Sequence, residues 1–200
     1  MSARRPRVIG LDLSLASTGV SDGQSVHAIQ TSPDEPLEAR LDRVVRGVVS
    51  FALSPTQWTD DFPQGCGADL AVIEAGAFSR GAQSEAAEIL SALRFMVRHR
   101  LWRLGIPYAM VTPSTLKLAT AGHGKATKQQ MVAAVDERHH TNLTAVKVKD
   151  GRYDMADAYA LAAMGYHHTG HPLPYHFPAQ PLNHQAMHAV RWPELLSDDA

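Results

Sequence analysis

The run Val8-Ile9-Gly10-Leu11-Asp12 places a carboxylate at the end of a short apolar segment. Such a run predicts a strand that is buried on both faces. A buried carboxylate is costly unless positive charge or hydrogen bonds offset it, so the fold must supply a partner for Asp12. A metal ion is one candidate, because binding sites of α/β sheets gather at strand ends. The alternative is a structural aspartate that is hydrogen-bonded to a turn at Ser17–Gly19.

The same pattern occurs a second time in the sequence. Asp69-Leu70-Ala71-Val72-Ile73-Glu74 is another short apolar run, and it too ends in an acid. Two predicted core strands that each end in a carboxylate favour the metal interpretation over the structural one.

Two more acids, Asp154 and Asp157, begin a predicted helix whose apolar body ends at Gly165. Their spacing of three places them on one face of the first turn. On their own, they are explained by capping and by interaction with the helix dipole. Together with the two strand-end acids, they predict the other half of a metal site. Four carboxylates without His or Cys suit Mg²⁺, or alternatively Mn²⁺.

The order of predicted elements indicates an α/β fold with an antiparallel beginning. Asp22-Gly23 predicts a tight turn before a strand at Val26–Ile29. Helices follow at about Pro36–Leu53 and Ser84–Leu104, with a further strand at Ile106–Val111. In the second helix, helical spacing predicts that Met96 and Leu104 lie on the buried face. This order fits a ribonuclease-H-like mixed sheet of about five strands flanked by helices.

Length and composition narrow the class of protein. Two hundred residues suggest one main domain, expected at 1–168, followed by a tail at 169–200 with a short helix near Gln185–Leu196. No apolar run is long enough for a membrane span. No long apolar segment follows the basic Met1–Arg7, so we do not expect it to be a secretory signal. The single Cys66 excludes an internal disulfide framework. We therefore expect a cytoplasmic protein without a membrane partner.

The net charge of −1 conceals a basic segment. From Arg94 to Arg152 there are eleven Lys and Arg residues but only three acids, an excess of eight positive charges. Such a local field can bind phosphates, although about half of these side chains are explained by solvated helix faces. Two helix starts lie in this segment, one at Thr112-Pro113 and one at the capping box Thr127–Gln130.

The chain resembles the RuvC family of Holliday junction resolvases from about Val8 to His168. The motifs that carry the resemblance occur in the family's order, and the most specific of them is the glycine-containing basic segment. They are Ile9-Gly10-Leu11-Asp12 with Thr18-Gly19, Ile73-Glu74, Pro113-Ser114-Thr115-Leu116-Lys117, Thr120-Ala121-Gly122-His123-Gly124-Lys125-Ala126-Thr127-Lys128-Gln129-Gln130 and Asp154-Met155-Ala156-Asp157-Ala158.

The resemblance implies a metal-dependent endonuclease that resolves four-way DNA junctions. Its two-fold homodimer would make paired nicks by a two-metal hydrolysis. The metal ligands would be the four acids, with catalytic help from two lysines. These residues are Asp12, Glu74, Asp154, Asp157, Lys117 and Lys128.

The resemblance also implies a set of DNA contacts. Phe78, in the loop after Glu74, would probe the open centre of the junction. The complete predicted set is Lys117, Lys125, Lys128, Phe78, Arg80, Lys147, Lys149 and Arg152. The chain departs from the family where Leu13-Ser14 replace the usual Pro-Gly after the first Asp, where the loop after Glu74 has only one aromatic, and in its tail.

Three alternatives remain at this point. A broader nuclease would cut forks or flaps, and a junction-binding protein would share the fold without cleaving. A sugar-kinase-like or actin-like ATPase also has a first-strand Asp before a turn with Gly and Thr. Such ATPases need two domains and a second phosphate loop, and the sequence supplies neither.

Overall fold

A five-stranded mixed sheet forms the centre of the computed structural model, which describes residues 5–54, 67–76, 84–174 and 182–195. The strand order is β3-β2-β1-β4-β5. The strands are β1 (Val8–Asp12), β2 (Ser17–Ser21), β3 (Val26–Gln30), β4 (Leu70–Glu74) and β5 (Tyr108–Val111). Strands β1, β4 and β5 are parallel, whereas β2 is antiparallel to both of its neighbours. The expected mixed α/β sheet is confirmed.

The structural alternative for Asp12 is a hydrogen bond to a turn at Ser17–Gly19. These residues belong to strand β2 and do not form a turn. In the β1–β2 pair, Asp12 lies opposite Gly19. The turn lies earlier, because the Thr18 hydroxyl donates to the Ser14 carbonyl at 2.6 Å and accepts from the Ser14 amide at 3.1 Å. These two hydrogen bonds fix the chain between β1 and β2.

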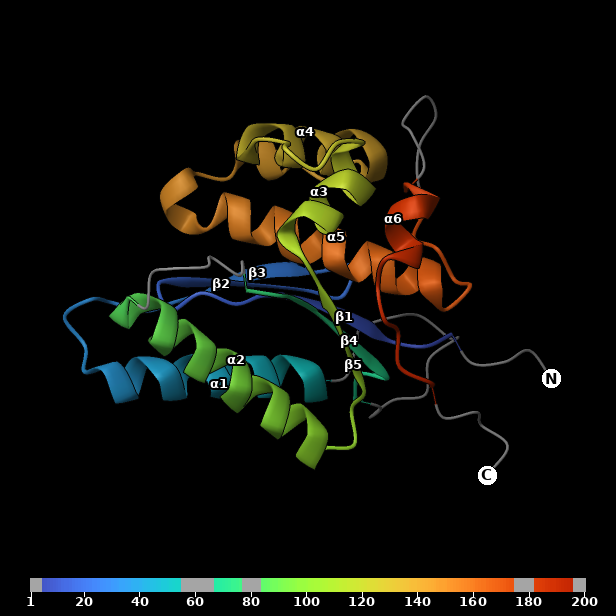
Figure 1. Ribbon diagram of the computed structural model, residues 1–200. Helices are drawn as coiled ribbons and strands as arrows, with labels where there is room; N and C mark the ends of the chain where they lie inside the picture. The colour runs from blue at the N-terminus through green and yellow to red at the C-terminus, as the bar shows by residue number, and fades with distance from the viewer. Residues whose placement is uncertain (1–4, 55–66, 77–83, 175–181, 196–200) are drawn as a thin grey trace.

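Helices cover both faces of the sheet, as Figure 1 shows. Helices α1 and α2 lie on one face, and α5 lies on the other with α3 and α4 beyond it. None of the described helices could cross a membrane. The helices are α1 (Leu37–Leu53), α2 (Glu85–Arg103), α3 (Pro113–Ala121), α4 (Lys128–His139), α5 (Arg152–His168) and α6 (His184–His188).

The alternation of side chains along each strand divides the core into two layers. Ile9, Leu11 and Ile73 pack with buried residues of α1 and α2. Val8 and Val72 point to the opposite face and pack with α5 and its neighbours. The direction of any strand residue therefore follows from its place in this alternation.

Helix α5 packs almost directly on the backbone of β1 and β2. A Cβ atom at Gly10 would lie 2.0 Å from the Ala158 carbonyl oxygen. One at Gly19 would lie 1.9 Å from the Asp154 carbonyl oxygen. Only glycine permits such an approach, so these two positions set the height of the helix above the sheet.

The boundaries of α5 differ from the prediction. The helix begins at Arg152 rather than Asp154, and it continues to His168 without stopping at Gly165. A Cβ at Gly165 would lie 2.4 Å from the Val8 side chain. This glycine therefore serves close packing against the sheet, and does not end the helix.

The outer face of α2 also differs from the prediction. Met96 and Leu104, expected on the buried face, are 37% and 41% exposed. The buried positions are Leu93, Val97 and Leu101, which follow a narrower stripe. The helix therefore buries one edge of its apolar surface and leaves the rest uncovered.

The segment after α5 packs on the domain. The predicted short helix is α6, which is confined to His184–His188 and contacts α3. Leu173, Ala186 and Met187 join the same buried cluster as the α5 face of the sheet. A boundary at residue 168 stays a prediction, and these contacts tie at least part of 169–200 to the core.

We predict that Gly19→Ala destabilises the protein by about 3 kcal/mol, the upper end of overpacking, because backbone atoms of Asp154 occupy the space of the new methyl group. Gly67→Ala is the matched control, since its Cβ would meet nothing nearer than 3.4 Å, and it should change stability by less than about 0.5 kcal/mol. Urea unfolding measures both. Equal effects of the two substitutions would contradict the assigned contact.

Candidate active site

Asp12 and Glu74 end two neighbouring parallel strands at the same edge of the sheet. Leu11 pairs with Ile73, so the next residues of β1 and β4 are neighbours. Asp12 continues the alternation of Val8, and Glu74 that of Leu70 and Val72, so both acids point to the face that α5 covers. Strand pairing and alternation thus bring the first two predicted ligands together.

The other two acids come from the first turns of α5. The close approach at Gly19 holds the backbone of Asp154 over β2, beside the strand that carries Asp12. Asp157 follows one turn later on the same face of the helix. The charges of both residues act on Asp12. The structure therefore gathers all four predicted acids, although they come from residues as far apart as 12 and 157.

The pKa of each acid reflects this crowding. Burial, then the charges of Glu74, Asp157 and Asp154, raise the pKa of Asp12 well above its ordinary value. Burial, then the charges of Glu74 and Asp154, raise the pKa of Asp157 to about 7. Burial also raises the pKa values of Glu74 and Asp154, although nearby hydrogen bonds and cations lower both values in part. Negative charge in this cluster is thus incompletely offset by the protein itself.

The donor chemistry of the cluster fits a divalent cation. Its oxygen atoms are the ligands that hard cations prefer, and a cation would relieve the repulsion that raises the pKa values. A side-chain hydrogen bond with Glu74 is the smallest of the causes that raise the pKa of Asp12, so these two carboxyl groups lie close together. Among the described residues, no three His, Cys, Asp or Glu side chains already form a closed ligand set. The four acids are thus close enough to act on one another electrostatically, but the described side chains do not form a completed metal site.

Two of the predicted lysines lie close to the acids. Lys117 is on α3, which Thr112 caps and Pro113 begins, and Lys128 is the first residue of α4. The charges of both lysines lower the pKa values of Glu74 and Asp157. The predicted capping box holds α4 in place, since the Thr127 amide donates to the Gln130 side chain at 2.8 Å.

The remaining predicted DNA contacts are distributed around this site. Lys125 is exposed in the connection between α3 and α4. Lys147 and Lys149 are exposed near the short helix Val148–Asp150. Arg152, at the start of α5, donates to the Val146 carbonyl. Two others, Phe78 and Arg80, lie outside the described residues.

Arg94 of α2 is a site residue that the sequence interpretation did not single out. Its charge favours the ionised forms of Glu74 and Asp12. Helical spacing places Arg94 next to the buried Leu93. That spacing does not indicate which part of the sheet the Arg94 side chain reaches. Its membership of the basic segment was the only signal.

Comparison with known proteins agrees with this geometry. No protein-family model matches the chain. The crossover junction endodeoxyribonuclease RuvC of Corynebacterium glutamicum is 30% identical over 166 residues, which cover 78% of this chain and 67% of that protein. The RuvC of Streptomyces griseus is 32% identical over 169 residues, which cover 78% and 72% of the two chains. The chain belongs to the RuvC family. The resemblance drawn from the motifs is confirmed, and with it the enzyme class of crossover junction endodeoxyribonucleases.

A solved RuvC structure shows the same fold. The Thermus thermophilus RuvC in complex with a Holliday junction substrate has a TM-score of 0.58 at 22% identity, covering 84% of this chain and 99% of that chain. The ribonuclease-H-like architecture expected from the element order is thereby confirmed. The roles of individual residues in the present chain stay predictions.

We predict that Asp157→Asn stabilises the cation-free protein by about 1–2 kcal/mol at pH 8 and has little effect at pH 4. Between the ordinary Asp value of 3.8 and about 7, the folded state keeps a proton that the unfolded state has released. Stability therefore falls as the pH rises through this window, and Asn avoids the loss.

The measurement is urea unfolding with a chelator at both pH values. Asp42→Asn is the control, since the Arg46 hydrogen bond lowers the pKa of Asp42 and its removal should not stabilise. An Asp157→Asn variant no more stable than the parent at pH 8 would show that other charges already offset this carboxylate.

Proposed function

We propose that this chain is a metal-dependent endonuclease that resolves four-way DNA junctions by paired, symmetric nicks. The proposal is supported chiefly by the convergence of four acids at the carboxyl end of β1 and β4, in a chain of the RuvC family. Lys117 and Lys128 beside those acids support it further. A cytoplasmic location, expected from the sequence, is part of the proposal.

The cation is Mg²⁺, with Mn²⁺ as the alternative, because all candidate ligands are carboxylates. Asp12 would be the central ligand, since it interacts with the other three acids. When bound, a pair of such cations supplies Lewis-acid activation of water and stabilisation of the leaving oxygen in phosphodiester hydrolysis. Asp12 is buried, so bulk water screens its charge only weakly.

The two lysines would act on the phosphate. Each lies within electrostatic reach of Glu74 and Asp157, so a phosphate at the acids is also near both ammonium groups. Positive charge at that place stabilises the charge that develops on the scissile phosphate. The Lys128 ammonium lies 5.3 Å from the centre of the Tyr153 ring, and this contact limits where it can point.

The alternatives differ in the products that they give. A fork or flap nuclease would share the whole site, so only substrate preference separates it from a resolvase. The non-cleaving binder is disfavoured because all four acids are present and gathered. An ATPase is disfavoured because the described residues form one sheet with no second phosphate loop.

We predict that Asp12→Asn lowers cleavage of a mobile four-way junction by about 10³-fold or more and leaves binding nearly unchanged. Lys117→Ala and Lys128→Ala should each lower the rate about 10- to 100-fold, with less than about 1 kcal/mol lost in stability. Arg191→Ala, an exposed cation beyond α6, is the control and should leave the rate within about two-fold.

The assay uses purified protein with Mg²⁺ or Mn²⁺ and junction, fork and flap substrates. Symmetric paired nicks in the junction support the proposal. Cuts confined to forks or flaps favour the broader nuclease. Binding without cleavage by the unaltered protein in either metal favours the binding protein.

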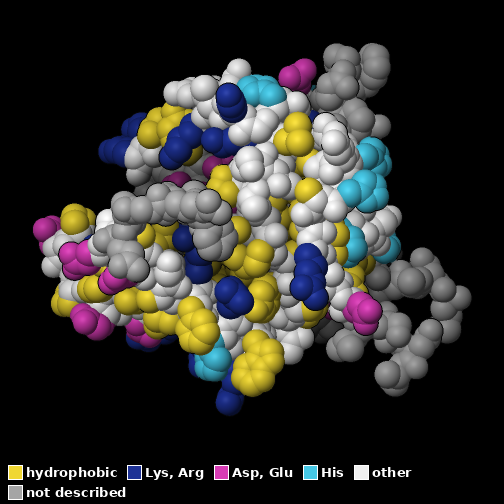
Figure 2. All heavy atoms as spheres, in the orientation of Figure 1, with side chains coloured by type: hydrophobic (Ala, Val, Ile, Leu, Met, Phe, Trp, Pro, Cys, Tyr) yellow, Lys and Arg dark blue, Asp and Glu magenta, His cyan; other side chains and the backbone are white. Residues whose placement is uncertain are grey.

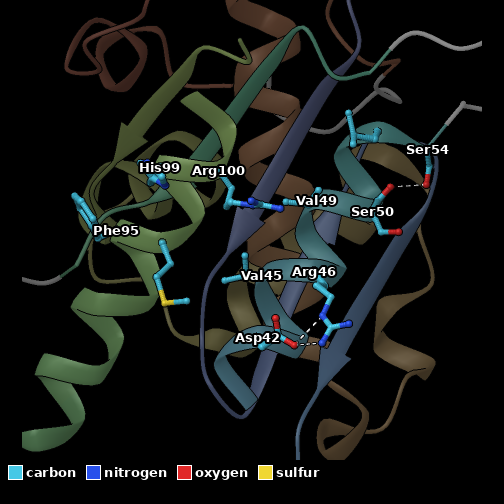
Figure 3. A pocket seen from close by; sticks show the side chains of 11 residues that line it. Asp42, Val45, Arg46, Val49, Ser50, Ser54, Phe95, His99 and Arg100 are labelled. Atoms are coloured by element: carbon cyan, nitrogen blue, oxygen red, sulfur yellow. Dashed lines mark hydrogen bonds and ion pairs between the residues drawn. The ribbon is translucent and has the colours of Figure 1, made fainter. Parts of the chain in front are cut away.

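The proposed assembly is a homodimer joined through the outer face of α1 and α2. A groove of about 790 Å³ lies there, and its lining includes Val45 and Val49 of α1 and Phe95 of α2. Figure 3 shows these side chains from close by. Phe95 is 66% exposed and Trp102 is 68% exposed, and His99 lies between them in a row of ring contacts. Large exposed aromatics are typical of protein interfaces, and a second copy of the chain would cover them.

We predict that Phe95→Glu raises the dissociation constant of the dimer by about 30-fold or more, because it places a charge at an apolar contact. The monomer should make single nicks in place of paired ones. Sedimentation analysis measures the first effect and product analysis the second. Val148→Glu, at an apolar residue 52% exposed on a different element, should leave the dimer intact. A monomeric parent protein would rule out this assembly.

A further inference from the structure

A groove leads away from the acids on the α2 side of the sheet. It has a volume of about 630 Å³ and begins at Glu74. Its walls come from the end of β4, from α2 and from the start of α3. They include Glu74, Gly76, Leu90, Arg94, Arg98 and Pro113. The groove is therefore continuous with the proposed catalytic site, on the side away from the helix α5.

Arg94 is positioned in this groove with unused hydrogen-bonding capacity. Its Nη1 atom lies over Gly76, at 2.9 Å from where a Cβ of that glycine would stand. Its Nε atom is buried and has no hydrogen-bond partner among the described residues. None of the ion pairs between described residues includes Arg94. A buried donor without a partner is costly, so the site favours an acceptor that enters the groove.

Arg98 lies one turn further along α2 and is held in a fixed direction. Its Nε donates to the Tyr108 hydroxyl at 3.2 Å, and its guanidinium lies 5.2 Å from the centre of the Tyr108 ring. Arg94 and Arg98 are thus two cations in line along one helix, starting beside Glu74. Successive anionic groups along a chain would match this row.

Figure 2 shows how charge is distributed over this side of the molecule. Lys and Arg side chains gather over the α3–α5 layer, whereas Asp and Glu side chains gather at one end of the α1–α2 layer. Helix α2 is acidic in its first turn, which contains Glu85 and Glu88. The arginines that line the groove follow further along the same helix. A polyanion bound at the acids would therefore also meet positive charge along this part of α2.

We propose that Arg94 binds a backbone phosphate of the cleaved DNA strand next to the scissile one, and that Arg98 binds the following phosphate. This inference rests on the proposed nuclease function. The planar fork of arginine can donate two parallel hydrogen bonds to a phosphate, and Arg94 lines the groove that such a phosphate would enter. The acids would then be flanked by cations on both sides, with Lys117 and Lys128 on one and the arginines on the other.

The test measures how junction binding depends on salt. Binding of a four-way junction is measured over a range of KCl concentrations without divalent cations, with Asp12→Asn as the parent. Each lost phosphate contact lowers the slope of log affinity against log salt by about 0.9. We expect this loss for Arg94→Gln and again for Arg98→Gln, whereas Arg94→Lys keeps the charge and the slope.

Arg103→Gln is the matched control. Arg103 is an exposed arginine of the same helix, nine residues from Arg94 and so on its opposite face. Its removal should leave the slope unchanged, with the oligomeric state checked for every variant. A purely structural Arg94 would lower stability in urea without changing the slope, so that result overturns the inference.

The two proposals fail in different ways. If the unaltered protein cuts junctions and Arg94→Gln and Arg98→Gln keep the parental slope, the inference is wrong and the proposed function stands. If Arg103→Gln lowers the slope as much as Arg94→Gln, the effect is one of general charge and the inference is also wrong. If the unaltered protein neither binds nor cuts the junction, both proposals fall.

Discussion

The contact between α5 and the backbone of β1 and β2 is the constraint on which the rest of the structure depends. At Gly10 and Gly19 no side chain separates helix from strand, so the helix is held at a height that any larger residue would change. The same contact fixes Asp154 above the strand pair that carries Asp12. Packing and site geometry are therefore one property of the molecule, and neither can vary without the other.

The charges gathered by this packing are unfavourable for the protein alone. Burial and mutual repulsion raise the pKa values of the four acids, and only a few cations at the rim oppose this. Lys117, Lys128 and Arg94 act on the acids from two sides, without any ion pair to them within 4 Å among the described residues. Such incomplete compensation is typical of sites that complete their charge balance with a ligand.

Much of this site could be predicted from residue patterns. Asp12 and Glu74 close two apolar runs, and the rule of alternating side chains then brings them to one face. The capping box at Thr127 located the start of α4 because its hydrogen bonds are local. Whether Gly165 ends α5 or packs within it depended on the distance between helix and sheet, which no local pattern encodes. The reach of Arg94 toward Glu74 likewise depended on how α2 lies across the sheet.

The position of α5 in the chain has a consequence for the newly made protein. The sheet and its acids, Asp12 and Glu74, are synthesised well before the helix that brings Asp154 and Asp157. A nascent chain on the ribosome has only half of the acidic cluster until residue 157 has emerged and α5 has docked. In the proposed mechanism, which uses all four acids, cleavage of DNA therefore becomes possible only late in biosynthesis, after α5 has docked on the sheet.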